Sequence, residues 1–93
     1  MAFVYGKIVY SPGVYTRIAE NGDSLFYEFV NISIIKHLSG DCGLFPFDKK
    51  SNMNAIANGE VVISAFAYRD GSSIRITTEA DRSSTQIIFP EEF

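Results

Sequence analysis

Residues 78–85, TEADRSST, place carboxylate, guanidinium and hydroxyl side chains between two apolar runs near the C-terminus. Glu79 and Asp81 are two residues apart, so on a strand they share one side, and paired carboxylates perform acid–base catalysis when burial raises one pKa. In a turn, Asp81 instead accepts hydrogen bonds from the serines that follow it. We therefore favour a structured polar turn held by Asp81, Ser83 and Thr85 over a catalytic site.

His37 is the only histidine, and Asp41 and Cys42 follow it closely enough to suggest a thiol nucleophile with its base. A histidine at a helix end more commonly binds the last carbonyl groups, however. One histidine among scattered acids lacks the spacing of a zinc or calcium site, and no glycine-rich loop joins a strand to a helix. We predict no metal, no cofactor and no catalytic residues; a small hydrolase using Glu79, Asp81 and His37 is the weaker alternative.

The chain has 93 residues, which we assign to one domain over residues 1–93, and its 46% hydrophobic content can fill a core. A single cysteine excludes an internal disulfide and fits the cytoplasm. No segment approaches the ~20 apolar residues of a membrane span, so we expect no membrane association. The net charge of −3 and the scattered Lys and Arg residues argue against broad nucleic-acid binding.

The N-terminal third predicts a strand followed by a helix. Residues 4–10 are rich in β-branched and aromatic side chains, which is typical of a strand. Residues 14–20 have apolar side chains at helical spacing, with Ser11 as N-cap and Asn21-Gly22 as the end. Because Asn-Gly is also a strong hairpin turn, a hairpin over residues 14–29 remains the alternative.

Two further helices are expected. From Asp23, a favourable N-cap, an apolar pattern at helical spacing continues to Gly40, which can end a helix in the left-handed conformation. After an apolar loop, Asp48 begins a polar helical stretch that Gly59 would end. The length of the pattern after Asp23 favours the helix over the hairpin.

The C-terminal third predicts a β-meander, with Asp70-Gly71 as a type I′ turn between residues 61–69 and 72–78 and a last strand over residues 85–89. Pairing Arg69 with Ser72 makes one apolar core face from Ile63, Ala65, Ala67, Ile74 and Ile76. The reverse face then carries Ser64, Phe66, Tyr68, Arg75 and Thr77. In this register Arg75 falls opposite Phe66 and could lie over its ring.

Together these elements predict an α+β fold. The expected antiparallel sheet combines the N-terminal strand with the C-terminal three-stranded meander, and two to three helices pack on one of its faces.

Six segments resemble a known family: SPGV at residues 11–14, FYEFV at residues 26–30, HLSGDCG at residues 37–43, SAF at residues 64–66, ITTEADRSST at residues 76–85 and FPEEF at residues 89–93. The chain is similar, over nearly its whole length, to small orphan proteins of conjugative plasmids, integrative elements and phages. Their pattern is His-x-x-Gly-Asp-Trp-Gly with Thr-Glu-x-Asp-Arg-Ser-x-Thr. This chain departs from it at Cys42, where the family has Trp, and near Arg75-Ile76, where an aromatic residue is common. The resemblance implies a mobile-element setting rather than a mechanism.

We therefore expect a small non-enzymatic accessory factor that binds a host or mobile-element protein, for example as an inhibitor of a defence system such as CRISPR. The residues expected to bind this partner are Glu79, Arg75, Arg82, Phe66 and Tyr68. The alternative is a regulator that contacts nucleic acid locally, stacking bases on Phe66 or Tyr68. Its cations would be Arg75, Lys36, Lys49, Lys50 and Arg82. The sequence leaves the oligomeric state open.

Overall fold

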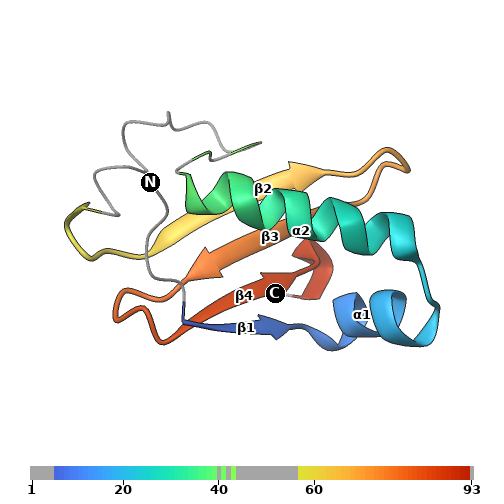
Figure 1. Ribbon diagram of the computed structural model, residues 1–93, viewed down its shortest axis with the longest axis horizontal. Coiled ribbons are helices and arrows are strands. Elements are labelled where there is room, and N and C mark those ends of the chain that lie inside the picture. The colour runs from blue at the N-terminus through green and yellow to red at the C-terminus, as the bar shows by residue number, and fades with distance from the viewer. Residues whose placement is uncertain (1–5, 40, 42, 44–56, 93) are drawn as a thin grey trace.

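The structure, a computed structural model, describes residues 6–39, 41, 43 and 57–92. A four-stranded sheet forms one layer, in the order β1-β4-β3-β2 (Figure 1). Its strands are β1 (Lys7–Tyr10), β2 (Val62–Ala67), β3 (Ser73–Thr78) and β4 (Ser84–Ile88).

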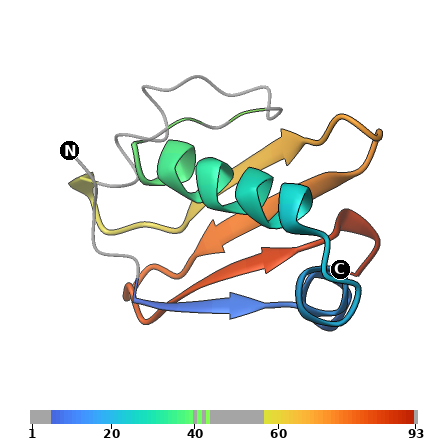
Figure 2. The same ribbon diagram turned by 45° about the vertical axis from the view of Figure 1, so that its right-hand side comes forward.

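The long helix forms the second layer, in front of the sheet, and the helical turns that follow the first strand lie beyond the end of that strand (Figure 1). Helix α1 (Pro12–Tyr15) continues into a π-helical turn, η1 (Thr16–Glu20). The long helix α2 (Ser24–Leu38) then crosses the sheet, as the turned view makes plain (Figure 2). A short 3₁₀ helix, η2 (Pro90–Glu92), follows the last strand.

The predicted α+β class is confirmed. Strands β2, β3 and β4 form the predicted antiparallel meander, whereas β1 pairs with β4 in parallel, with Lys7 opposite Ser84. The sheet is therefore mixed rather than wholly antiparallel. The stop at Gly40 and most of the expected helix after Asp48 lie outside the described residues. Gly59, where that helix was expected to end, is described and has a φ of +68° just after a helical residue at position 57.

The helix starts follow the predicted caps. The Ser11 hydroxyl accepts a hydrogen bond from the Val14 amide at 3.3 Å, and Asp23 Oδ1 accepts one from the Phe26 amide at 3.1 Å. Between the helices, Gly22 has a φ of +62°, which glycine adopts without strain. The helical interpretation is therefore right, and the hairpin over residues 14–29 is wrong.

The predicted register of the β2–β3 hairpin is wrong by one residue. Phe66 and Ser64 lie opposite Ile74 and Ile76, where Ala67 and Ala65 were expected. The cause is the loop, which has three residues rather than two.

In that loop the Gly71 amide donates to the Tyr68 carbonyl at 3.0 Å, and the Tyr68 amide donates to the Ser72 carbonyl at 2.8 Å. Gly71 has a φ of +91°. A turn followed by a glycine at positive φ is the usual three-residue hairpin loop.

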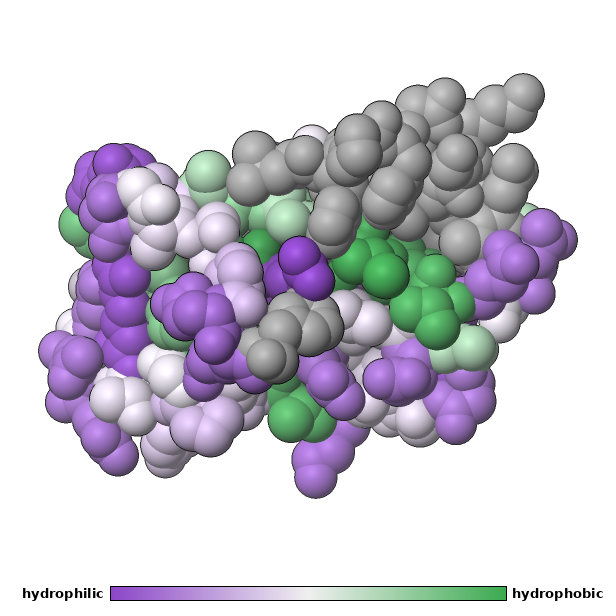
Figure 3. Space-filling model, turned by 180° about the vertical axis from the view of Figure 1, so that it is seen from behind, coloured by the Kyte–Doolittle hydropathy of each residue, from purple (hydrophilic) through white to green (hydrophobic). Residues whose placement is uncertain are grey.

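The shifted register changes which side chains of β2 face the core. Phe66 is 7% exposed and belongs to the core, together with Ile74 and Ile76 as predicted. Ile63 and Ala67 were expected in the core but alternate onto the reverse face, and Ala65 also points there although it is buried. Seen from behind, the described residues of the reverse side are a mixture of hydrophilic and hydrophobic types (Figure 3).

Arg17 ties three parts of the fold together. Its Nε lies 3.0 Å from the carboxylate of Asp23, the N-cap of α2, and its terminal nitrogen lies 2.6 Å from Asp70 in the hairpin loop. The guanidinium group also lies 4.1 Å from the centre of the Phe26 ring. Hydrogen bonds from Ser72 and Arg17 lower the pKa of Asp70 to about 2. The first turn of α2 is thus fixed to the hairpin loop.

Ile76→Ala tests the corrected faces of the sheet. Ile76 is fully buried between Ser64 and Ile87, so its truncation should lower the free energy of unfolding by about 2–5 kcal/mol. The neighbouring Thr77→Ala, on the reverse face, should cost less than about 1 kcal/mol. Urea unfolding of both variants measures the difference, and equal losses would contradict this assignment of faces.

Candidate functional site

His37, in the last turn of α2, is fully buried and bound through both ring nitrogens. Its Nδ1 lies 2.6 Å from the hydroxyl oxygen of Ser64 on β2, and its Nε2 lies 2.8 Å from that of Thr78 on β3. The Thr78 hydroxyl lies 2.7 Å from that of Thr85 on β4. A chain of polar groups thus joins the helix to three strands.

The ring is neutral at pH 7, because burial, with a contribution from the Arg82 charge, lowers the pKa of His37 to about 4. A neutral imidazole donates from one nitrogen and accepts at the other, so the hydrogen bonds can run in one direction along the chain. Burial without such partners would cost about 1–3 kcal/mol for each polar group. The network therefore satisfies groups that could not otherwise be buried.

A histidine hydrogen-bonded to a serine is also the geometry of a nucleophile with its general base. Here the Ser64 and His37 side chains are both fully buried, so a substrate cannot reach the hydroxyl oxygen in this conformation. The ring nitrogens bind Ser64 and Thr78 rather than the last carbonyls of the helix, which was the interpretation preferred from the sequence. The Asp41 carboxylate, considered there as a group that could orient the ring, accepts a hydrogen bond from the Gly43 amide at 2.9 Å. Cys42 lies outside the described residues.

Residues 79–83 form the turn between β3 and β4. The Ser83 amide donates to Asp81 Oδ1 at 3.0 Å, which is one of the hydrogen bonds expected from the sequence. Hydrogen bonds from Ser83 lower the pKa of Asp81, which opposes a role as a proton donor at neutral pH. Arg82 has a φ of +62°, and its guanidinium group donates to the carbonyls of Glu60 and Glu79 at 2.7 and 3.1 Å. Thr85 lies beyond the turn, in the core.

The residues predicted to bind a partner do not form one surface. Phe66 is buried, and Arg75 lies on the reverse face opposite Ala65 rather than opposite Phe66. Lys36 is on α2, on the other side of the sheet, where its Nζ lies 5.9 Å from the centre of the Phe66 ring. Lys49 and Lys50 lie outside the described residues. Two of the cations predicted to contact nucleic acid, Arg75 and Lys36, therefore lie on opposite sides of the sheet.

The outer side of α2 carries large apolar side chains that the core does not use. Leu25, Ile32 and Ile35 are 52%, 47% and 67% exposed, while Phe26 and Val30 on the inner side are fully buried. The helix is apolar on both sides, which is typical of helices that are buried all round. None of the described helices is long and apolar enough to cross a bilayer.

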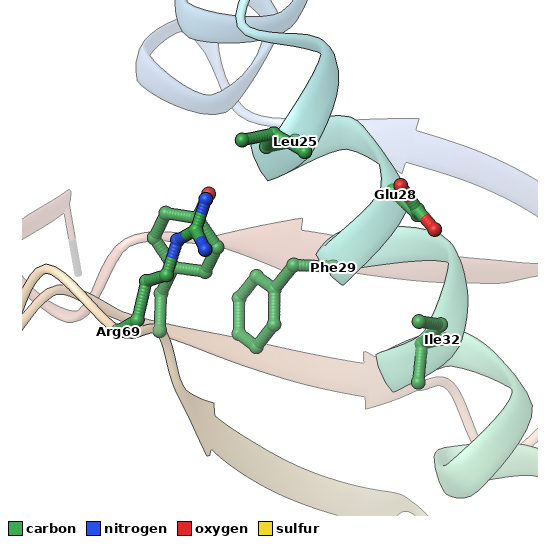
Figure 4. A pocket seen from close by; sticks show the side chains of 6 residues that line it. Leu25, Glu28, Phe29, Ile32 and Arg69 are labelled. Atoms are coloured by element: carbon green, nitrogen blue, oxygen red, sulfur yellow. The ribbon is translucent and has the colours of Figure 1, made fainter.

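A shallow groove of about 220 Å³ lies between this side of α2 and the hairpin loop (Figure 4). Leu25 and Phe29 project from the helix toward the hairpin, which contributes Arg69. Tyr68, one of the predicted partner-binding residues, also lines the groove, and its ring centre lies 4.9 Å from that of Phe29. Glu28 and Ile32 complete the lining.

Comparison with protein-family models, curated proteins and solved structures finds no match. The resemblance to mobile-element proteins therefore stays a prediction. Within residues 6–39, 41, 43 and 57–92, no three His, Cys, Asp or Glu side chains lie close enough to hold a metal ion.

Sequence reasoning missed both features of this site. The His37 network left a signal in the strands, where Ser64, Thr78 and Thr85 are polar residues on the core side of the sheet. Thr78 and Thr85 alternate with exposed or half-buried neighbours, whereas Ala65, next to Ser64, is buried as well. The outer face of α2 left a signal in the segment SLFYEFVNISIIKHL, which has more apolar residues than one buried face needs.

The His37 network predicts a specific loss of stability in mild acid. The folded-state pKa is depressed to about 4 from 6.5, so the unfolded chain takes up a proton first as the pH falls. The stability contributed by the neutral ring is complete above pH 6.5 and is lost progressively down to pH 4, by about 3 kcal/mol in total.

Urea unfolding between pH 7.5 and pH 4 measures this loss. In His37→Gln, which cannot titrate, the decline between pH 6.5 and pH 4.5 should be much smaller than in the wild type. Parallel pH profiles for the two proteins would show that His37 is not the group responsible.

Proposed function

We propose that the protein is a non-enzymatic protein-binding domain and that its binding surface is the outer face of α2. The observation that carries this proposal is the exposure of Leu25, Ile32 and Ile35 on one helix whose opposite side is already buried in the core. We call these three residues, together with the half-buried Phe29, the α2 outer face.

Leaving these apolar side chains in water is unfavourable in free energy. Each square ångström of apolar surface removed from water contributes roughly 25 cal/mol, and a fully buried Leu or Ile side chain contributes about 1.5–3 kcal/mol. Single exposed apolar residues are ordinary, but a contiguous apolar patch on a small domain commonly marks an interaction site. The groove lined in part by Phe29 and Tyr68 adjoins this patch, and a side chain of a partner can pack into it.

The polar clusters support binding rather than catalysis. The His37 and Ser64 side chains are fully buried, so a substrate cannot reach them. The Asp81 carboxylate accepts a hydrogen bond from the Ser83 amide, and the Arg82 guanidinium group donates one to the Glu79 carbonyl. Each therefore has a structural role that accounts for its residue types.

The family resemblance suggests the setting. In it the protein is a cytoplasmic accessory factor of a mobile genetic element or phage that acts stoichiometrically on a host or element protein. Inhibition of a host defence system is one form that this action would take.

Ile35→Glu tests the proposal, because Ile35 is 67% exposed and the substitution should leave the melting temperature nearly unchanged. An unpaired charge buried within an apolar interface should abolish protein association. Affinity purification of the tagged wild type and variant, with cross-linking and mass spectrometry, measures the proteins retained, including untagged copies of the chain.

The matched control is Gln86→Glu, which adds a charge to an exposed position on the reverse face. Association that survives Ile35→Glu but is lost in Gln86→Glu would assign binding to the reverse face. Salt-dependent binding of single-stranded DNA or RNA by both variants would favour the nucleic-acid alternative.

A further inference from the structure

We propose that the partner of the α2 outer face is a second copy of this chain, packed antiparallel so that the two α2 helices cross at Ile32. The inference rests on the proposed function, since it names the occupant of the same face. Such a contact is isologous, with the same patch contributed by both copies about a two-fold axis.

The spacing of the outer face fits helix-to-helix packing. Leu25, Phe29, Ile32 and Ile35 follow one another at intervals of four, three and three residues, so they lie in one stripe along the helix. Apolar side chains spaced by three and four residues are those that interdigitate between paired helices. Since α2 has 15 residues, the stripe extends along most of the helix.

The charges of α2 select the antiparallel arrangement. Helix α2 has one acidic and one basic side chain on its exposed surface, Glu28 and Lys36. Glu28 comes four residues before Ile32 and Lys36 four residues after it. A two-fold axis at Ile32 therefore places Glu28 of each copy opposite Lys36 of the other, forming two complementary pairs.

The same axis matches the apolar residues. Phe29 comes three residues before Ile32 and Ile35 three after, so Phe29 of one copy lies opposite Ile35 of the other. A parallel pairing in register would instead place Glu28 against Glu28 and Lys36 against Lys36. The distribution of charge on this helix thus favours one register and one direction.

The charged pairs set the register, and the apolar contact supplies most of the binding energy. Exposed ion pairs contribute little to affinity, and complementary charges act more on specificity than on affinity. We therefore expect a reversible dimer whose population rises with protein concentration.

Charge reversal tests the register directly, by sedimentation velocity over a range of concentrations. Glu28→Lys and Lys36→Glu each replace two opposite-charge pairs with two like-charge pairs. The dimer dissociation constant of each single variant should therefore be up to about tenfold higher than that of the wild type. The double variant restores both pairs and should dimerise like the wild type. A mixture of the two single variants should form the heterodimer, because each copy supplies the charge that the other needs.

Glu91→Lys, which makes the same change at an exposed residue of η2, is the control and should dimerise like the wild type. Unchanged circular dichroism and melting of every variant establish that the fold is intact. Dimers that are insensitive to both single reversals would place the interface elsewhere and overturn the inference.

A wild type that stays monomeric at every concentration would also overturn the inference. If Ile35→Glu then still abolishes capture of another protein, the α2 outer face binds a different partner and the proposed function stands. If Ile35→Glu changes neither self-association nor capture, both proposals fail.

Discussion

The orientation of α2 depends on the buried ring of His37. Because the ring binds β2 through Ser64 and β3 through Thr78, the last turn of the helix cannot rotate without breaking hydrogen bonds in a region closed to water. At the other end, Arg17 binds the N-cap Asp23 and the hairpin loop residue Asp70. Two polar anchors therefore decide which apolar residues of α2 enter the core and which face solvent.

The polar tract after β3 has a related role. Thr78 and Thr85, at its two ends, lie opposite each other on β3 and β4 and are fully buried, where they extend the hydrogen bonds of His37 into the sheet. Between them, Arg82 adopts a left-handed conformation and binds two backbone carbonyls. The tract is thus a turn whose ends belong to the core. Its density of hydroxyl groups follows from the need to satisfy buried polar atoms.

The sequence predicted what depends on local chemistry. Ser11 and Asp23 mark helix starts because their side chains accept hydrogen bonds from amides three residues later. The register of the hairpin was not predictable from Asp70-Gly71, because the same dipeptide fits a two-residue loop and the last two positions of a three-residue loop. That single residue decides whether Phe66 or Ala67 enters the core.

The candidate site was less predictable, because it depends on contacts between distant segments. His37 is separated from Ser64 by 27 residues and from Thr78 by 41, whereas the interpretations available from the sequence used only its near neighbours, the last carbonyls of the helix and Asp41. Similarly, the apolar excess of α2 is visible in the sequence, but the side of the helix that remains exposed is known only once the anchors are placed. The general class of the fold follows from periodicity, whereas its surfaces follow from tertiary contacts.

The proposed pairing of two copies of the chain about Ile32 depends on the apolar face that the two anchors of α2 leave in solvent. Disulfide trapping tests it most directly, with cysteine placed at Ile32 in a Cys42→Ser background. A two-fold axis at this position brings the two new thiols together, so mild oxidation should convert most of the protein into a covalent dimer. Asn31→Cys, on an exposed neighbouring position directed to another side of the helix, should remain largely monomeric under the same conditions. Equal cross-linking of the two variants, or none at Ile32, would contradict the claim.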